Sequence, residues 1–218
     1  MDCSSYTKFF YESELKSSQV LGIGKELKKN MFLRNKKNDL STEKTIELEK
    51  ALSESALAQI GYMKQDEELA KQFGLEICIN DNLPDDVEAV LDKTDSPDYK
   101  GIIQIKRKYK NNSFSFIHEI IHYVFDVRPG NRVEKQYARN VKGKTKDQRE
   151  QEINYLTAAY QLPYTKMIGE LRSFNKQYPR DELRFVAKLC NEYKQPREAV
   201  LRRIREVKRI AAAKNERI

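Results

Sequence analysis

Residues 113–126 read SFSFIHEIIHYVFD and contain both histidines of the 218-residue chain. His118 and His122 stand four positions apart, and Glu119 directly follows the first, which is the H-E-x-x-H arrangement. On a helix this spacing presents two imidazoles on one face, with a carboxylate beside them, as a zinc site requires. The sequence therefore predicts a helix over 113–126, the zinc-motif helix, that carries a metal site.

The rest of the zinc-motif helix is apolar, so it is expected to be buried on most sides. Its polar residues fall in one narrow strip: Ser115, His118, Glu119, His122 and Asp126. Buried ionisable groups need partners, and a metal ion is one such partner. The alternative is a pair of satisfied core histidines that match the motif by accident. Asp126 lies about 12 Å along the axis from His118, too far for both to reach one ion, so it either holds His122 from behind or is an ordinary helix-terminal residue.

The composition is typical of a soluble globular protein, with 39% hydrophobic and 34% charged residues. No apolar stretch is long enough to span a membrane, and the N-terminus lacks a secretory signal pattern. Cys3, Cys78 and Cys190 are odd in number and far apart, which fits reduced thiols better than a disulfide framework. We therefore expect a cytoplasmic protein with no membrane association.

The net charge of +8 is concentrated in two basic segments, residues 25–37 and the C-terminal run 197–217. Such charge is typical of a solvated helix face and less often forms a docking surface for DNA or an acidic partner. The pattern does not indicate an oligomeric state.

The order of the remaining segments predicts an α+β fold, with a small three-stranded sheet packed with the zinc-motif helix and a mainly helical C-terminal half. Residues 127–147 read as a polar loop, either a substrate lid or a flexible insertion. The predicted strands are residues 75–79, 87–91 and 101–106. The predicted helices outside the motif are residues 41–60, 66–73, 148–162, 165–178, 181–193 and a basic helix after Pro196.

Three regions follow from this order. Residues 1–40 form an N-terminal extension with a short helix near 9–26 and a linker near 28–38. Residues 41–165 form the metal-binding core. Residues 166–218 form a helical region whose last two helices resemble a helix-turn-helix, for which a basic capping helix is the plainer interpretation.

A catalytic zinc usually takes three protein ligands, and the chain has no third histidine. The helix predicted from Gln148 has a broad apolar face with Glu152 at its centre, while Glu150 projects from the opposite side. A carboxylate within an apolar face is costly unless it meets a cation. We therefore predict Glu152 as the third ligand, with a buried salt bridge to a lysine or arginine as the alternative.

The motif HEIIHY at 118–123, followed by EINYLTA at 152–158 and by Pro163, resembles the ImmA/IrrE family of bacterial and phage metallopeptidases. The resemblance covers roughly residues 45–165. It implies a zincin-like fold and a zinc site completed by the first glutamate of the second helix, here Glu152. It also implies site-specific cleavage of a helix-turn-helix transcriptional repressor, which relieves repression of a mobile element or a stress regulon. Ile117, Ile121 and Ile153 stand where the family often has alanine or glycine, which makes this site bulkier.

The residues themselves predict zinc-dependent peptide hydrolysis with Glu119 as the general base. A side chain that stabilises the oxyanion is also expected, and Tyr137 and Tyr160 are candidates. An extended substrate is expected to add as a strand at the sheet edge, with 101–106 the closest strand. Two alternatives remain: a non-catalytic anti-repressor or DNA-associated regulator, and a toxin-like or defence protease with another target.

Overall fold

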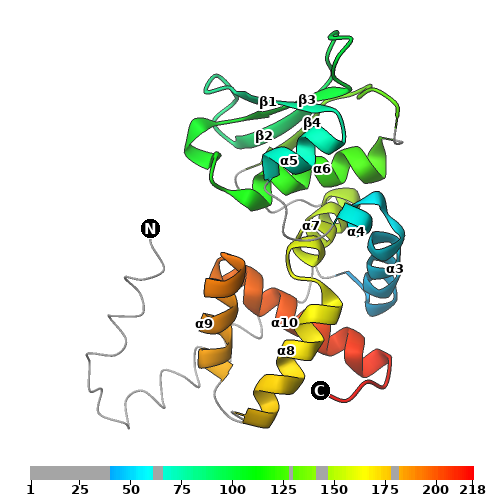
Figure 1. The fold of residues 1–218 in the computed structure, drawn as a ribbon, viewed down its shortest axis with the longest axis vertical. Coiled ribbons are helices and arrows are strands. Elements are labelled where there is room, and N and C mark those ends of the chain that lie inside the picture. The colour runs from blue at the N-terminus through cyan, green and yellow to red at the C-terminus, as the bar shows by residue number, and fades with distance from the viewer. Residues whose placement is uncertain (1–39, 61–65, 128–129, 141–146, 178–181) are drawn as a thin grey trace, which may run out of the picture. The chain divides into compact units, whose positions relative to one another are not determined.

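The computed structural model describes residues 40–60, 66–127, 130–140, 147–177 and 182–218. These residues form a small sheet with the helices on one side of it (Figure 1), which confirms the predicted α+β class. The helix predicted near residues 9–26 and the linker near 28–38 lie outside the described residues. The strands are β1 (Leu75–Ile79), β2 (Val87–Asp92), β3 (Gly101–Ile105) and β4 (Tyr137–Asn140). The helices are α3 (Thr42–Glu54), α4 (Ala56–Ile60), α5 (Asp66–Gln72), α6 (Ser113–Asp126), α7 (Gln148–Gln161), α8 (Tyr164–Gln177), α9 (Glu182–Tyr193) and α10 (Arg197–Ala213), with a 3-10 turn at Arg107–Tyr109.

The zinc-motif helix is α6, and it has the predicted bounds. It begins after Asn112, whose side-chain oxygen accepts a hydrogen bond from the Phe114 N–H at 3.2 Å. This contact satisfies one of the amide groups that a helix start leaves without an intrahelical partner. Every residue from Ser115 to Tyr123 is buried, as the apolar pattern predicts.

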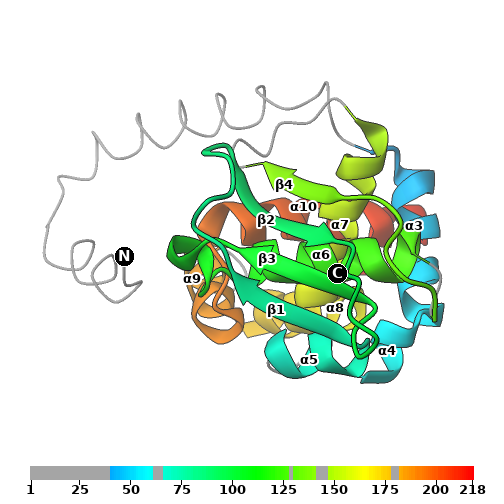
Figure 2. The same ribbon diagram turned by 90° about the horizontal axis from the view of Figure 1, so that it is seen from above.

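The sheet is mixed, with the strand order β1-β3-β2-β4 (Figure 2). β1 and β3 are parallel, whereas β2 runs antiparallel to both β3 and β4. All three predicted strands are present, and β4 extends the sheet from within the segment predicted to be a loop. The expectation that residues 101–106 offer a free edge is wrong, because β3 pairs on both sides. The edges among the described strands are β1 and β4.

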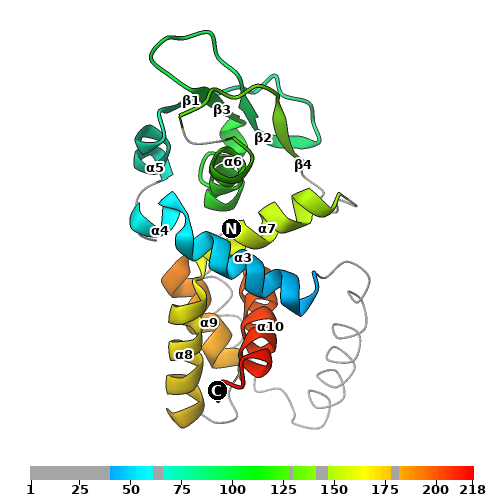
Figure 3. The same ribbon diagram turned by 90° about the vertical axis from the view of Figure 1, so that its right-hand side faces the viewer.

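α6 lies between the sheet and α7. α5 and α6 pack on one face of the sheet, and α7 packs against α6 on the side away from the strands (Figure 3). α7 also contacts α3 and α10, so it has neighbours on several sides. No helix in the described part of the chain is long and apolar enough to cross a membrane.

The segment between α6 and β4 is anchored to the sheet. The Val133 N–H donates to the Lys100 carbonyl at 3.1 Å, and the Val133 side chain is buried against Gly101. A Cβ atom at Gly101 would lie 2.6 Å from Val133 Cγ2, so only glycine allows this approach. The Arg132 guanidinium also donates to the Thr94 carbonyl at 3.1 Å. These contacts fix the start of β4 where an open loop was expected.

The C-terminal helices belong to the same compact unit as the sheet, which comprises residues 41–218. Their main polar link is Arg203 of α10, whose side chain is fully buried. Its guanidinium donates to the Leu162 carbonyl at 2.8 Å, to the Tyr155 hydroxyl at 3.0 Å and to Glu49 at 2.5 Å. Arg203 therefore joins α10 to the end of α7 and to α3.

Replacing Arg203 with methionine should destabilise the protein strongly. The change leaves the Glu49 carboxylate, whose side chain is 12% exposed, without its buried cation, and losing one partner of a buried pair typically costs about 3–5 kcal/mol. Urea unfolding of the metal-free protein would measure the free energy of unfolding. Arg205→Met on the exposed side of α10 is the control and should change it by no more than about 0.5 kcal/mol. Equal effects of the two substitutions would contradict the assigned role.

Candidate metal centre

The H-E-x-x-H residues all face the interior. His118 and Glu119 are fully buried and His122 is 1% exposed. The two imidazole centroids lie 4.8 Å apart, with the rings nearly perpendicular. One turn of α6 therefore presents both rings to the same small volume, as the four-residue spacing predicts.

The third member of the cluster is Glu150, in the first turn of α7. Its two carboxylate oxygens lie 3.3 Å from His118 Nε2 and 3.1 Å from His122 Nε2. One ligand atom from each of these three residues lies within 4.8 Å of the others, a separation compatible with one metal ion. Two imidazoles and one carboxylate are also a ligand set that catalytic zinc commonly takes.

Glu152, the predicted third ligand, does not approach the histidines. Its carboxylate lies 2.9 Å from Arg149 Nη1 and 3.5 Å from Lys44 Nζ. The prediction that Glu152 points inward is right, because the residue is 7% exposed. However, α7 packs between α6 and α3, and Glu152 faces α3. There it forms salt bridges, which was the alternative prediction for this residue.

The apolar-face projection of α7 missed Glu150. It lies outside the apolar face, and its side chain is 25% exposed. A catalytic metal must be reached by its substrate, so a ligand at the rim of the buried layer is as reasonable as one at its centre. The projection of α7 weighed burial alone and therefore selected Glu152.

The charges in the cluster favour an added cation. Burial by itself lowers the pKa of His122, but contacts with Asp126 and Glu150 outweigh burial and raise that pKa to about 9. Burial raises the pKa of Glu150, whereas its contacts with the two imidazoles lower it well below the usual range. The site thus stabilises positive charge, which protons or a divalent cation can supply. The donor set therefore fits a metal ion.

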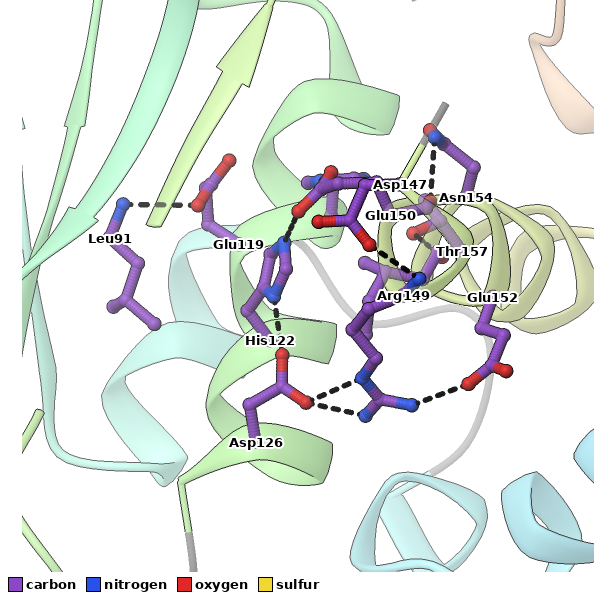
Figure 4. A network of polar contacts seen from close by, with 12 residues as sticks. Leu91, Glu119, His122, Asp126, Asp147, Arg149, Glu150, Glu152, Asn154 and Thr157 are labelled. Carbon is purple, nitrogen blue, oxygen red and sulfur yellow. Dashed lines mark hydrogen bonds and ion pairs between the residues drawn. The ribbon is translucent and has the colours of Figure 1, made fainter. Parts of the chain in front are cut away.

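Asp126 orients His122 from the side opposite to Glu150. Its Oδ2 lies 2.7 Å from His122 Nδ1, and Figure 4 shows the imidazole between the two carboxylates. An Nδ1–H bonded to Asp126 leaves Nε2 as the metal-binding nitrogen of the neutral ring. Of the two roles left open for Asp126, the structure supports the one in which Asp126 holds His122 from behind.

Glu119 is held against the sheet rather than against the histidines. Its Oε2 accepts a hydrogen bond from the Leu91 N–H of β2 at 3.0 Å (Figure 4). The arrangement keeps a buried, fixed carboxylate one residue from His118.

The two tyrosines considered as oxyanion donors are placed differently. The Tyr137 ring, at the start of β4, lies 4.7 Å from the His122 ring. Tyr160 is buried ten residues beyond Glu150 on α7, which corresponds to about 15 Å along the helix. Only Tyr137 is therefore close enough to act at the cluster.

Comparison with known proteins gives one match. The IrrE N-terminal-like domain family, Peptidase_M78, matches residues 70–205. This range contains the whole His118, His122 and Glu150 cluster and extends into α10. Neither a curated protein nor a solved structure matches the chain.

The two glutamates of α7 can be separated by their effects on metal binding. Glu150→Gln should lower the zinc affinity by more than about 100-fold, because it removes a ligand and not an outer partner. Glu152→Gln is the matched comparison, with the same chemical change two residues away; it should retain about one zinc per chain and lower the affinity less than Glu150→Gln, because Glu152 contacts Arg149 and Lys44 and not the histidines. Competition with a chromophoric chelator measures both. The reverse order would restore Glu152 as the ligand.

Proposed function

Because the chain belongs to the M78 peptidase family, we propose that it is a zinc-dependent endopeptidase that cleaves a helix-turn-helix transcriptional repressor. The observation that carries the enzymatic part is the convergence of two imidazole nitrogens and the Glu150 carboxylate beside the buried Glu119. The repressor target rests on the family resemblance of the motif-bearing helices.

The chain's own residues divide the chemistry between them. His118, His122 and Glu150 would hold the ion, with Asp126 fixing the tautomer of His122. When bound, zinc supplies Lewis acidity, which polarises a peptide carbonyl and makes water nucleophilic near neutral pH. Glu119 accepts the proton from the attacking water and passes it to the leaving amine. The hydrogen bond from the Leu91 N–H fixes the position of the Glu119 carboxylate.

The substrate would align with β4. This strand is the sheet edge that contacts α6, and its first residue stacks on a proposed ligand. The other edge, β1, contacts α5. An extended peptide can pair with the exposed amides and carbonyls of an edge strand, which brings its backbone past the metal site. Tyr137 is the candidate donor to the oxyanion.

The proposed repressor target agrees with a cytoplasmic location, where the substrate would be found. Cys78 and Cys190 are free thiols in the structure, one exposed and one buried. Reduced cysteines are typical of proteins that work in the cytosol.

Changing Glu119 to glutamine should abolish cleavage and leave the metal in place. The amide cannot accept the proton from water, so the rate should fall by about 10²–10⁴-fold. The assay incubates the zinc-loaded protein with a helix-turn-helix repressor encoded beside its gene and follows fragments by mass spectrometry. Glu68→Gln, an exposed change on α5, is the control and should cleave normally.

Three outcomes would redirect the proposal. Full cleavage by zinc-loaded Glu119→Gln would remove Glu119 from the chemistry. Full derepression in cells by a variant that no longer cleaves would favour the non-catalytic anti-repressor. Cleavage of another protein, with the repressor left intact, would favour the defence or toxin-like protease.

A DNA-associated role has one supporting observation. α9 and α10 are joined by residues 194–196, with Lys194 in the left-handed conformation at φ 52°, and α10 exposes Arg202, Arg205 and Lys208. The opposite side of α10 is buried against its neighbours, as in the plainer interpretation of a basic capping helix.

The DNA role predicts binding that weakens steeply as salt increases. Replacing the three exposed cations by glutamine should then reduce both the affinity and the salt slope. Electrophoretic shifts at several salt concentrations would measure both quantities. Absent or salt-independent binding would reject the role and leave cleavage as the function.

A further inference from the structure

A line of alternating charges connects the two helices that carry the candidate ligands. It runs from His122 to Asp126 on α6, then to Arg149 and Glu152 on α7, and ends at Lys44 on α3. We propose that Arg149 is a positioning residue for the metal site, because it ties the carboxylate that orients His122 to the helical turn that carries Glu150. This inference rests on the proposed metal-binding function.

The two oxygens of the Asp126 carboxylate contact different residues. Arg149 Nε and Nη2 lie 2.7 and 2.5 Å from Asp126 Oδ1, while Oδ2 of the same carboxylate lies 2.7 Å from His122 Nδ1 (Figure 4). These charge-assisted contacts hold Oδ1 in place, and the His122 contact holds Oδ2, so the carboxylate is restrained at both oxygens. The orientation of the His122 ring therefore depends on Arg149 through Asp126.

The second contact fixes Arg149 to its own helix. Nη1 lies 2.9 Å from Glu152 Oε2, and Lys44 of α3 lies 3.5 Å from the other oxygen of Glu152. Glu150 lies between Arg149 and Glu152 in the sequence and projects to the α6 side of the same turn. A restraint on both of its neighbours therefore limits where the Glu150 carboxylate can be.

Such a restraint is needed because the ligands come from separate helices. His118 and His122 keep their spacing through the geometry of α6 alone. Glu150 reaches them only if the first turn of α7 stays beside the middle of α6, and residues 127–147 separate the two helices in sequence. Apart from the contacts of Glu150 itself, the Arg149 guanidinium makes an ionic contact between the two helices next to the proposed ligands.

The contribution of Arg149 should appear in metal affinity more than in stability. The Asp126 and Glu152 side chains are 14% and 10% exposed, whereas that of Arg149 is 39% exposed. When Arg149 is replaced, Asp126 keeps His122 and Glu152 keeps Lys44 as a partner, and a pair whose cation is partly open to water contributes less to the free energy of folding than a fully buried one. Outer partners of metal ligands, by contrast, typically affect metal affinity by about 10–100-fold.

The test measures zinc affinity by chelator competition and the visible absorption spectrum of the cobalt-substituted protein. Arg149→Gln should lower the zinc affinity about 10–100-fold and alter the cobalt spectrum. Arg149→Lys keeps the charge but cannot hold both carboxylates, so its affinity should be intermediate. Arg172→Gln is the matched control. Arg172 lies on α8, away from the cluster, is 48% exposed and pairs with Glu216 at 3.0 Å. It should leave both readouts unchanged.

The outcomes separate this inference from the function on which it rests. If the unmodified protein binds no stoichiometric zinc, the proposed metal site itself is wrong. If it binds zinc and Arg149→Gln matches it in affinity and in cobalt spectrum, the metal site stands and the role of Arg149 is overturned. Thermal unfolding of the metal-free variants reports on folding. Should Arg149→Gln not fold, Arg149→Lys decides, and an affinity equal to that of the unmodified protein overturns the role.

Discussion

The structure depends on a cluster of ionisable groups buried between α6 and α7. Two imidazoles and a carboxylate meet within 4.8 Å at a place largely removed from water. Charges in such a place are costly unless opposite charges neutralise them. Contacts with Asp126 and Glu150 raise the pKa of His122, and contacts with the two imidazoles lower the pKa of Glu150, so the cluster favours added positive charge. A chain that builds this arrangement therefore provides a cation site, and the neighbouring helices must hold the groups together.

Much of the fold could be predicted because its signals are local. The bounds of α6 follow from an apolar run that ends where polar residues begin. After α5, Gly74 takes the left-handed φ of 71° that is expected at the end of a helix. The three strands were visible as short apolar runs between turn residues, and the α+β class followed from their order. The identity of the two histidines and Glu119 followed from spacing alone.

The order of the strands and the third residue of the cluster could not be predicted from local signals. β3 pairs with β1 on one side and with β2 on the other, and only contacts between distant residues decide such an order. β4 is four residues long and depends on Val133 fitting against Gly101, a contact that no periodicity shows. The choice between Glu150 and Glu152 depends on which neighbour each side of α7 meets. Both carboxylates are partly buried, so burial alone does not distinguish a metal ligand from a salt bridge.

The position of α7 also explains why the family match continues beyond the predicted core. One side of this helix carries Glu150 toward α6, and another carries Tyr155, whose hydroxyl accepts a hydrogen bond from the buried Arg203 of α10. Glu49 of α3 contacts both Tyr155 and Arg203, so the C-terminal helix and α3 support α7 from behind. The match ends at residue 205, after Arg203. If the cluster holds a metal, α7 must stay at a fixed distance from α6, and Arg203 of α10 contributes to that position through its contacts with Tyr155 and Leu162.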